Sequence, residues 1–390
     1  MNIKMVDLHN QYLSIRNEID DAINKVITSS TFIKGPDVEK LEKELSRFLN
    51  VKHCITCGNG TDAILLSLMA INLTAGDEVI VPAFSFAAPA EAVALLGGIP
   101  VFADVDKDTF NIDPTSVKRL ISSRTKAVIP VHLFGQPCAM PELLEIAEKY
   151  GLKIIEDNAQ SLGSKCNMSD NTQKYAGTVG HIGCTSFFPS KVLGCFGDGG
   201  AIFTNDDVLA QRIRALANHG QKTKYYHQYL GFNSRLDTIQ AAVLNAELPH
   251  LNDWINHRKR AADYYTSNLK DLPAVKLPTQ VPFGTHVYHQ YTIKVKSVYR
   301  DKLKVALDKA EIPSMIYYPM PLPCQPIYQN SCICDPYIKN AMELPYSVLS
   351  LPMHSELTNR QQDIIIETIK LFFTQNKEDI LSTSTFVQNN

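Results

Sequence analysis

Three chain segments combine residue types that serve amino-group chemistry. The first reads TSFFPSKVLGCFGDGG, and in it Lys191 stands between an aromatic run and a glycine-rich run. A lysine becomes a good imine-forming nucleophile when burial or neighbouring cations disfavour its charged form. The neighbours of Lys191 are apolar and tight-turning, and Ser186 can donate a hydrogen bond to an anion. Most lysines are simply solvated, so this segment alone leaves both interpretations open.

The second segment, IIEDNAQS, is an apolar run that delivers Glu156, Asp157 and Gln160 at its end. Successive side chains of a strand point to opposite faces, so Glu156 and Asp157 should diverge. A partly buried carboxylate needs a cationic partner, and a protonated pyridine nitrogen would be one. A helix-capping aspartate is the alternative explanation.

The third segment is GNGTDA, at residues 58–63. Gly60 lets the backbone approach a ligand closely, and a following helix would offer free N–H groups and a positive dipole end. Thr61 and Asp62 suit a helix start, so a capped helix after a glycine turn is the alternative. No Gly-Lys-Ser/Thr follows, and no G-x-G-x-x-G occurs in the chain, which argues against a P-loop and a nicotinamide dehydrogenase.

Together the three segments offer a phosphate cradle, a carboxylate and a lysine. An enzyme that uses pyridoxal phosphate (PLP) needs this set: a phosphate anchor, an aspartate for the ring nitrogen and a lysine that forms a Schiff base.

The elements that position these residues alternate between short apolar strands and helices from residue 53 to residue 157. This rhythm predicts an α/β fold with a mostly parallel sheet covered by helices on both faces. Ligands of such sheets bind beyond the carboxyl ends of the strands. The chain is expected to begin with an amphipathic helix over 6–29. After residue 180 two strands, CTSFFP and GGAIFTND, should pair, and a long helical run should cover 236–268.

The length of 390 residues suits two domains. We expect an N-terminal helical segment and a large domain in residues 1–250, and a smaller α+β domain in residues 251–378. Residues 379–390 are expected to form a frayed polar tail.

Composition excludes several other classes of protein. The net charge of -2 and the absence of a basic stripe argue against nucleic-acid binding. The start lacks the order of a signal peptide, and the longest apolar run contains Glu91 and two prolines, so we expect a cytoplasmic protein without membrane insertion. Cys54 and Cys57 form a C-x-x-C without a second pair at zinc spacing. We therefore expect nine free thiols and no metal site.

These segments resemble the DegT-type sugar aminotransferases, which are PLP enzymes of the aspartate-aminotransferase fold (fold type I), with a sheet of the seven-stranded type. The resemblance covers nearly the whole chain. It runs from FIKGPDVEKLE through GNGTDA, GDEVIVPAFSF, EDNAQS, TSFFPSKVLGCFGDGG, HGQ, GFNSRLD and YYPMPL to LPMH.

The resemblance implies a role for each matching residue. Lys191 would bind PLP covalently and carry the transferred proton, and Asp157 would pair with the pyridine nitrogen. Asn233 would reach the phosphate of the neighbouring subunit's cofactor, which implies a homodimer with shared active sites. The other implied cofactor contacts are Gln160 near the 3-hydroxyl, Phe86 stacked on the ring, and Gly60, Thr61, Asp62 and Ser186 around the phosphate.

The lysine also favours amino transfer, because the related sugar dehydratases carry histidine in its place. Within the family the chain most resembles the members that transfer an amino group from L-glutamate to UDP-2-acetamido-2-deoxy-3-oxo-glucuronate, in O-antigen and lipopolysaccharide biosynthesis. Arg235 would bind the uronate carboxylate, or else pair with Asp237. Tyr317, Tyr318 and His227 would line the sugar pocket. The usual His-Tyr-Pro is Tyr317-Tyr318-Pro319 here, which puts the exact sugar in doubt.

Two alternatives stay open at this point. In the first alternative, the acceptor is a 3-keto- or 4-keto-6-deoxy nucleotide sugar. In the second the chain is a non-catalytic regulator on the same fold.

Overall fold

The centre of the protein is an eight-stranded sheet with the order β1-β9-β8-β5-β4-β2-β3-β14. The computed structural model describes residues 2–329 and 331–376. Only β9 runs antiparallel to its neighbours in this sheet, so the predicted mostly parallel sheet is confirmed. The strands are β1 (His53–Cys57), β2 (Glu78–Pro82), β3 (Ile99–Ala103), β4 (Thr125–Val128), β5 (Lys153–Asp157), β8 (Ile182–Ser186), β9 (Gly200–Thr204) and β14 (Ile333–Cys334).

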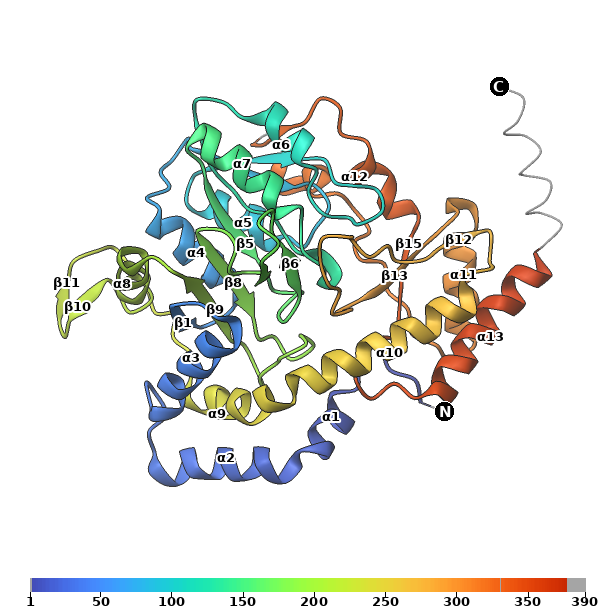
Figure 1. Ribbon diagram of the computed structural model, residues 1–390, viewed down its shortest axis with the longest axis horizontal. Helices are drawn as coiled ribbons and strands as arrows, with labels where there is room; N and C mark the ends of the chain where they lie inside the picture. Colours follow the sequence, from blue (N-terminus) through green and yellow to red (C-terminus); the bar gives the residue numbers. More distant parts are fainter. Residues whose placement is uncertain (1, 330, 377–390) are drawn as a thin grey trace.

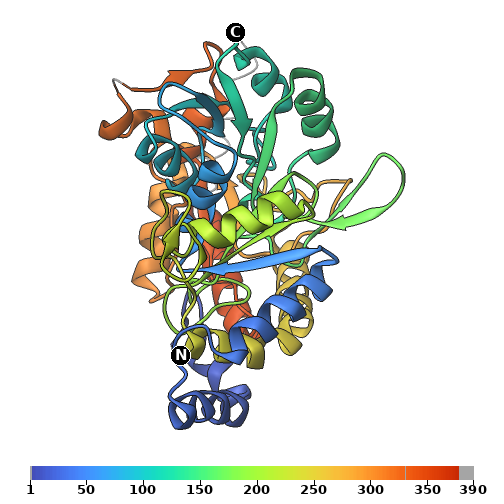
Figure 2. The same cartoon turned by 90° about the vertical axis from the view of Figure 1, so that its left-hand side faces the viewer.

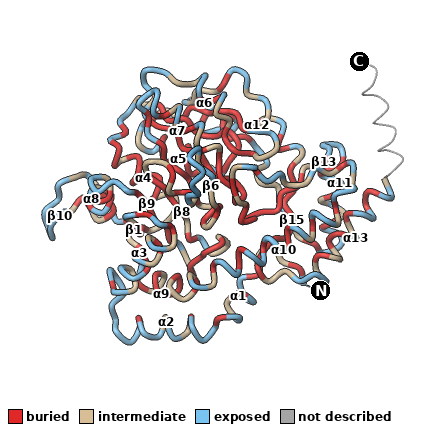
Figure 3. The backbone as a smooth tube through the Cα atoms, in the orientation of Figure 1, coloured by how far each residue is buried: buried red, intermediate tan, exposed pale blue. Residues whose placement is uncertain are grey.

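Helices cover both faces of this sheet, as the alternation of strands and helices predicts (Figure 1). One face carries α4 (Gly60–Ala70), α5 (Ala88–Leu95) and α8 (Asp207–Leu216), which share a core with the sheet. The other face carries α6 (Pro114–Leu120) and α7 (Met140–Tyr150). Every residue of β2 and β9 is buried, and Figure 3 shows the buried centre. Apolar strands buried on both sides explain the lack of polar alternation in these segments.

The expected single helix over 6–29 is wrong. The chain forms α1 (Leu8–Ser14) and α2 (Arg16–Ser29), and Ile15 lies between them with φ -128° and ψ 25°. The N–H of Ile15 bonds to the carbonyl of Tyr12, which closes α1 with a tight turn while the Ile15 side chain is buried. In Figures 1 and 2, α2 lies at the end of the molecule opposite α6 and α7.

The long helical run over 236–268 is also divided. It forms α9 (Thr238–Glu247) and α10 (Leu251–Leu269), separated by a 3₁₀ turn, Leu248–His250. Pro249 lies in that turn and has no N–H to continue the helix. Helices α2 and α3 (Pro36–Leu49) both pack against α9.

The C-terminal part builds a second, three-stranded antiparallel sheet with the order β12-β13-β15. Its own core includes α10, which runs along both parts of the molecule in Figure 1. The domain boundary at residue 250 stays a prediction, and β14 from the C-terminal part joins the large sheet. The predicted tail, 379–390, lies outside the described residues. The elements are β12 (Val275–Lys276), β13 (Tyr291–Val295), β15 (Val348–Leu351), α11 (Ser297–Lys309), α12 (Asn340–Glu343) and α13 (Asn359–Gln375).

Two small hairpins lie outside the main sheets. The hairpin β10 (Gln221–Thr223)–β11 (Tyr226–His227) projects from the body and is largely exposed (Figures 1 and 3). The other is β6 (Lys165–Asn167)–β7 (Gln173–Tyr175). The remaining 3₁₀ turns are Leu133–Gly135, Leu322–Cys324, Pro326–Tyr328 and Leu344–Tyr346. Within residues 2–329 and 331–376, no helix has the length and apolar character needed to cross a membrane.

Candidate active site

Lys191 lies in a tight turn between β8 and β9, whose antiparallel pairing was predicted. The turn is closed by backbone hydrogen bonds of 2.8 Å from Lys191 N–H to the carbonyl of Phe188 and from Cys195 N–H to the carbonyl of Phe187. Lys191 as a whole is partly exposed, but desolvation of its amine lowers the pKa to about 8, against the opposing charge of Asp157. The neutral form of this amine, which a nucleophilic lysine requires, is therefore much more populated at neutral pH than in an ordinary lysine.

Asp157 ends β5, and its side chain faces the lysine turn. It is 6% exposed, and one carboxylate oxygen accepts the N–H of Ala159 at 3.0 Å. Burial raises the pKa of Asp157, while the Ala159 N–H, Lys191 and His132 oppose the rise. No salt-bridge partner lies within 4 Å of this carboxylate in the described part of the chain. A cation placed above Asp157 would thus find an unpaired carboxylate.

Glu156 points to the opposite face of β5, so the two consecutive carboxylates diverge as predicted. Its oxygens accept three backbone N–H groups, from Gly177, Val179 and Gly180, at 2.6–2.8 Å. His132 Nε2 lies 2.8 Å from Glu156 Oε2. Glu156 is therefore fully engaged in holding the loop after β7 and is not available to a ligand.

Gln160 joins the end of β5 to the C-terminal part of the chain. Its carbonyl oxygen accepts the N–H of Phe134 at 2.7 Å, and its amide donates to the hydroxyl of Tyr318 at 3.1 Å. The ring of Tyr318 also packs near Phe86, with the ring centroids 6.3 Å apart, and near Tyr317 at 5.8 Å. Phe86 is 57% exposed, so one face of its ring is free to stack on a ligand.

The N-terminus of α4 forms a narrow cradle against the end of β8. A Cβ on Gly60 would lie 2.7 Å from Cβ of Ser186, so only glycine fits. Thr61 follows in the same first helical turn, whose N–H groups have no partner inside the helix. Asp62 was expected to contact the phosphate, but its N–H group already donates a hydrogen bond to the side-chain oxygen of Asn59 at 2.8 Å.

Ser234, which the sequence motifs did not single out, ties a second segment to this cradle. Its hydroxyl accepts the N–H of Gly58 at 2.9 Å and donates to the carboxylate of Asp62 at 2.7 Å. The flanking Asn233 is exposed, and its side-chain oxygen accepts a hydrogen bond from Nε of Arg235 at 2.7 Å. Arg235 thus pairs with an amide and not with Asp237.

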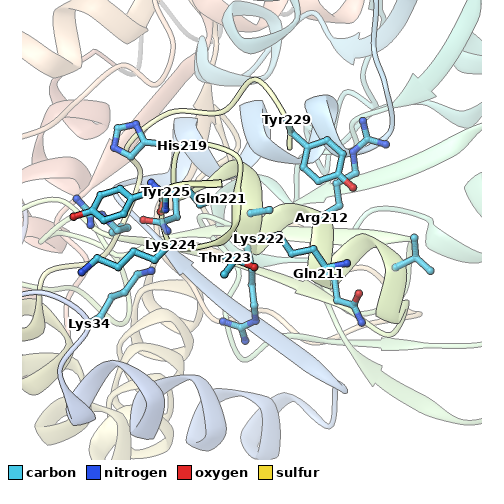
Figure 4. Close-up of a pocket in the computed structure, with 15 residues that line it drawn as sticks. Lys34, Gln211, Arg212, His219, Gln221, Lys222, Thr223, Lys224, Tyr225 and Tyr229 are labelled. Atoms are coloured by element: carbon cyan, nitrogen blue, oxygen red, sulfur yellow. The ribbon is translucent and has the colours of Figure 1, made fainter. Parts of the chain in front are cut away.

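A cavity of about 900 Å³ opens beside Arg235, between α8 and the β10–β11 hairpin (Figure 4). None of its 15 lining residues, all in the described part, is acidic. Burial and the charges of Arg235 and Arg214 lower the pKa of Lys34, which comes from the N-terminal segment. His227 lies in the same hairpin, where its Nδ1 is 2.8 Å from the carbonyl of His219. The cationic lining residues are Lys34, Arg212, Arg214, Lys222, Lys224 and Arg235.

The predicted residues therefore fall into two groups. The first group lies near the carboxyl ends of the large sheet's strands, and Tyr317 and Tyr318 reach it from the C-terminal part. Its other members are Lys191, Asp157, Gln160, Phe86 and the Gly60–Ser186 cradle. In the second group, Arg235 lines the cationic cavity, Asn233 is bonded to Arg235, and His227 lies in the hairpin that flanks the cavity. Neither Lys191 nor Asp157 lines this cavity. Lys34 stands in the motif FIKGPDVEKLE, but no role was predicted for it, and the other cationic residues apart from Arg235 lie in stretches without a recognisable motif.

The first group fits PLP on chemical grounds. A partly neutral amine, an unpaired carboxylate and an open aromatic face are what the aldehyde, the ring nitrogen and the ring of that cofactor require. The glycine-walled helix start suits its phosphate.

Comparison with known proteins gives the same result. Residues 13–370 match the DegT/DnrJ/EryC1/StrS aminotransferase family. The chain is 44% identical to the pleiotropic regulatory protein of Geobacillus stearothermophilus, over 96% of this chain and 99% of that one. It is 42% identical to the UDP-2-acetamido-2-deoxy-3-oxo-D-glucuronate aminotransferase of Pseudomonas aeruginosa, over 93% of this chain and 98% of the other.

Among solved structures, DesV of S. venezuelae in complex with a ketimine intermediate superposes with a TM-score of 0.91. The two sequences are 36% identical, over 95% of this chain and 98% of that one. The chain belongs to the DegT/DnrJ/EryC1/StrS aminotransferase family, and it is an aminotransferase whose cofactor is pyridoxal phosphate.

Proposed function

We propose that this enzyme transfers an amino group from L-glutamate to the 3-keto group of UDP-2-acetamido-2-deoxy-3-oxo-glucuronate, in the cytoplasm, for O-antigen or another surface glycan. The relative from P. aeruginosa that bears this activity in its name supports the choice of sugar. The observation that carries the proposal is the cationic cavity next to Arg235.

A UDP-linked uronate is strongly anionic, because it carries a diphosphate and a carboxylate. Six cationic side chains and no acidic one line the cavity, so its field favours such a ligand over a neutral one. Arg235 follows Ser234, whose hydroxyl is bonded to Gly58 and Asp62 next to the cradle, and its Nε is held by the Asn233 amide. Its remaining N–H groups are in the fork arrangement that a carboxylate matches.

PLP supplies the electron sink that makes amino transfer between the two substrates feasible. Asp157 would keep a proton on the ring nitrogen, and burial of this carboxylate strengthens that interaction. Nζ of Lys191 would remove and return the proton that moves during transfer, which its lowered pKa suits. Phe86 would fix the plane of the ring, and Gln160 with Tyr318 would border the acceptor side.

We also propose a homodimer with shared active sites. Asn233 is exposed, and the cationic residues lie apart from Lys191 within one chain. The projecting β10–β11 hairpin, with Tyr225 80% and Leu230 91% exposed nearby, is suited to cover a second copy. In that arrangement Asn233 and the cationic cavity of one protomer would serve the cofactor phosphate and the sugar of its partner.

The test compares different acceptor sugars with glutamate as the amino donor. The reaction rate is measured as the formation of 2-oxoglutarate. The matched pair is UDP-2-acetamido-2-deoxy-3-oxo-glucuronate and the corresponding 3-keto sugar with an uncharged C6 hydroxymethyl group. We expect kcat/KM to favour the uronate, and Arg235→Gln to lower kcat/KM about 10- to 100-fold for the uronate alone, the range for losing a charged hydrogen-bond partner. Turnover of deoxy sugars only would contradict the choice of the uronate.

Two other functions are separable by the same assay. A 3-keto- or 4-keto-6-deoxy nucleotide sugar offers no carboxylate, so its turnover would be indifferent to Arg235→Gln. A regulatory role is suggested by the name of the G. stearothermophilus relative. Such a protein would bind the cofactor without converting glutamate to 2-oxoglutarate. The presence of both Lys191 and Asp157, the residues that amino transfer needs, argues against this role.

A further inference from the structure

The C-terminal part of the chain brings together a pair of cysteines that amino transfer does not use. Cys332 and Cys334 flank Ile333 at the short edge strand β14, and their sulfur atoms lie 3.9 Å apart. Both residues are partly exposed. A third thiol, Cys324, is exposed and rests 3.7 Å from the sulfur of Met342.

The other six thiols are buried, so an oxidant in solution does not reach them readily. Cys54 and Cys57 form the conspicuous C-x-x-C, but both are buried, and positions three apart on β1 face opposite sides of the sheet. The remaining four are buried as well: Cys138, Cys166, Cys184 and Cys195. Cys332 and Cys334 are therefore the accessible pair of neighbouring thiols in the described part of the chain.

We propose that Cys332 and Cys334 form an oxidant-sensitive dithiol that closes reversibly to a disulfide. A hydroperoxide oxidises the first thiol to a sulfenic acid. In this step the O–O bond of the hydroperoxide breaks, and water or an alcohol leaves. The second thiol then attacks this sulfur, the S–S bond forms, and a water molecule leaves. Overall the two thiols lose two protons and two electrons, and the electrons reduce the peroxide.

Partial burial of the pair affects how readily its thiols react. Desolvation, with smaller effects of Cys332 and Cys324, raises the pKa of Cys334 to about 12. A thiol that holds its proton this firmly is a poor first nucleophile, because the thiolate is the reactive form. Closure of the pair should therefore be slow at neutral pH and faster at higher pH, whichever of the two thiols meets the oxidant first.

The strand geometry explains why closure is reversible. Residues two apart on a strand have Cα atoms about 6.6 Å apart, near the upper limit that a disulfide spans. Closure must pucker the chain at Ile333, which pairs with Val101 of β3. A strained, accessible disulfide is readily reduced by small thiols. Oxidation should also free β14 from β3.

The experiment uses the full-length protein with PLP bound, first reduced and then treated with an equimolar amount of hydrogen peroxide. Free thiols are blocked with N-ethylmaleimide, and cleavage after Tyr328 separates Cys324 from the pair. We expect a peptide that has lost two hydrogen atoms and carries an unblocked Cys332–Cys334 pair, and dithiothreitol should reverse the change. Hydrogen exchange at Ile333 and Cys334 should rise after oxidation.

Variants sharpen the assignment. Cys332→Ser and Cys334→Ser should each abolish the two-hydrogen loss, and Cys324→Ser should preserve it as the matched control. The peptide map of the unmodified protein needs no variant, so a folding defect does not affect it. The proposal is overturned if both thiols are blocked by N-ethylmaleimide after peroxide treatment, or if the disulfide maps to Cys324.

Discussion

Nε2 of His132 donates a hydrogen bond to Oε2 of Glu156 across 2.8 Å, and both side chains are fully buried. The direction is fixed because Nδ1 of His132 accepts the N–H of Cys138 at 3.0 Å. Glu156 precedes Asp157 on β5, so this pair anchors the strand end from which Asp157 faces the cofactor site.

Glu156→Gln should destabilise the protein by roughly 3 kcal/mol, because an amide would direct its own N–H groups at donors where the carboxylate accepts. Thermal unfolding with PLP bound would measure the loss. Glu145→Gln, at an exposed position in the middle of α7, is the control and should leave the melting temperature unchanged. Equal melting temperatures for the two variants would show that the Glu156 contacts do not hold the strand end.

The amine of Lys191 should titrate near pH 8 in the protein without PLP, since desolvation lowers the pKa of this lysine to about 8. The rate at which PLP attaches to the apoprotein should therefore rise with pH and level off above that value. Asp157 acts in the opposite direction and raises the pKa of Lys191, so Asp157→Asn should move the midpoint of this profile to lower pH. A midpoint near the ordinary lysine value, or an upward shift in the variant, would refute this description.

Gly60→Ala should weaken PLP binding about 10- to 100-fold, since the new Cβ would lie 2.7 Å from Cβ of Ser186 at the end of β8. Titration of the apoprotein with PLP gives the affinity. Gly58→Ala is the matched variant, because its nearest contact is the end of the Asp62 side chain at 3.1 Å. If Gly60→Ala binds PLP as tightly as Gly58→Ala and the native protein do, the phosphate does not bind in this cradle.

Glu247 should make the protein less stable as the pH rises. It is 4% exposed, its hydrogen bond from Gly194 N–H is long at 3.4 Å, and burial raises its pKa from 4.5 to about 8. Between these values the folded protein holds a proton that the unfolded chain has lost, so stability falls with rising pH across this window.

Glu247→Gln removes the ionisation. The variant should gain stability over the native protein as the pH rises from 4.5 to 8, on the order of 4 kcal/mol in total. Denaturation measured at pH 5 and at pH 8 provides the comparison. A difference that is the same at both pH values would mean that Glu247 ionises normally.

The sequence could predict the sheet, because apolar strands buried on both faces repeat with intervening helices. It also predicted the divergence of Glu156 and Asp157, since that follows from the period of a strand. Lys191, Asp157 and Gly60 stand in contiguous motifs that a single chain segment displays. These features depend on neighbours in sequence, where local geometry decides the outcome.

The missed features depend on contacts between distant segments. Lys34 meets Arg235 only when the N-terminal loop folds onto the segment after α8, and Ser234 meets Gly58 across 176 positions. The break at Ile15 was missed because the apolar spacing runs through it without a proline or glycine. The β14 strand is only two residues long and exists because it pairs with β3.

The most direct test of the central claim is covalent attachment of PLP in Lys191→Ala, with Lys153→Ala at the exposed start of β5 as control. Each protein is incubated with PLP, reduced with borohydride, mapped by peptide mass and assayed for 2-oxoglutarate formation from glutamate. We predict that the native protein and Lys153→Ala carry reduced PLP on Lys191 and turn over. Lys191→Ala should fold normally, carry none and be inactive. Full activity in Lys191→Ala, or attachment of PLP to another lysine in the native protein, would contradict the assignment.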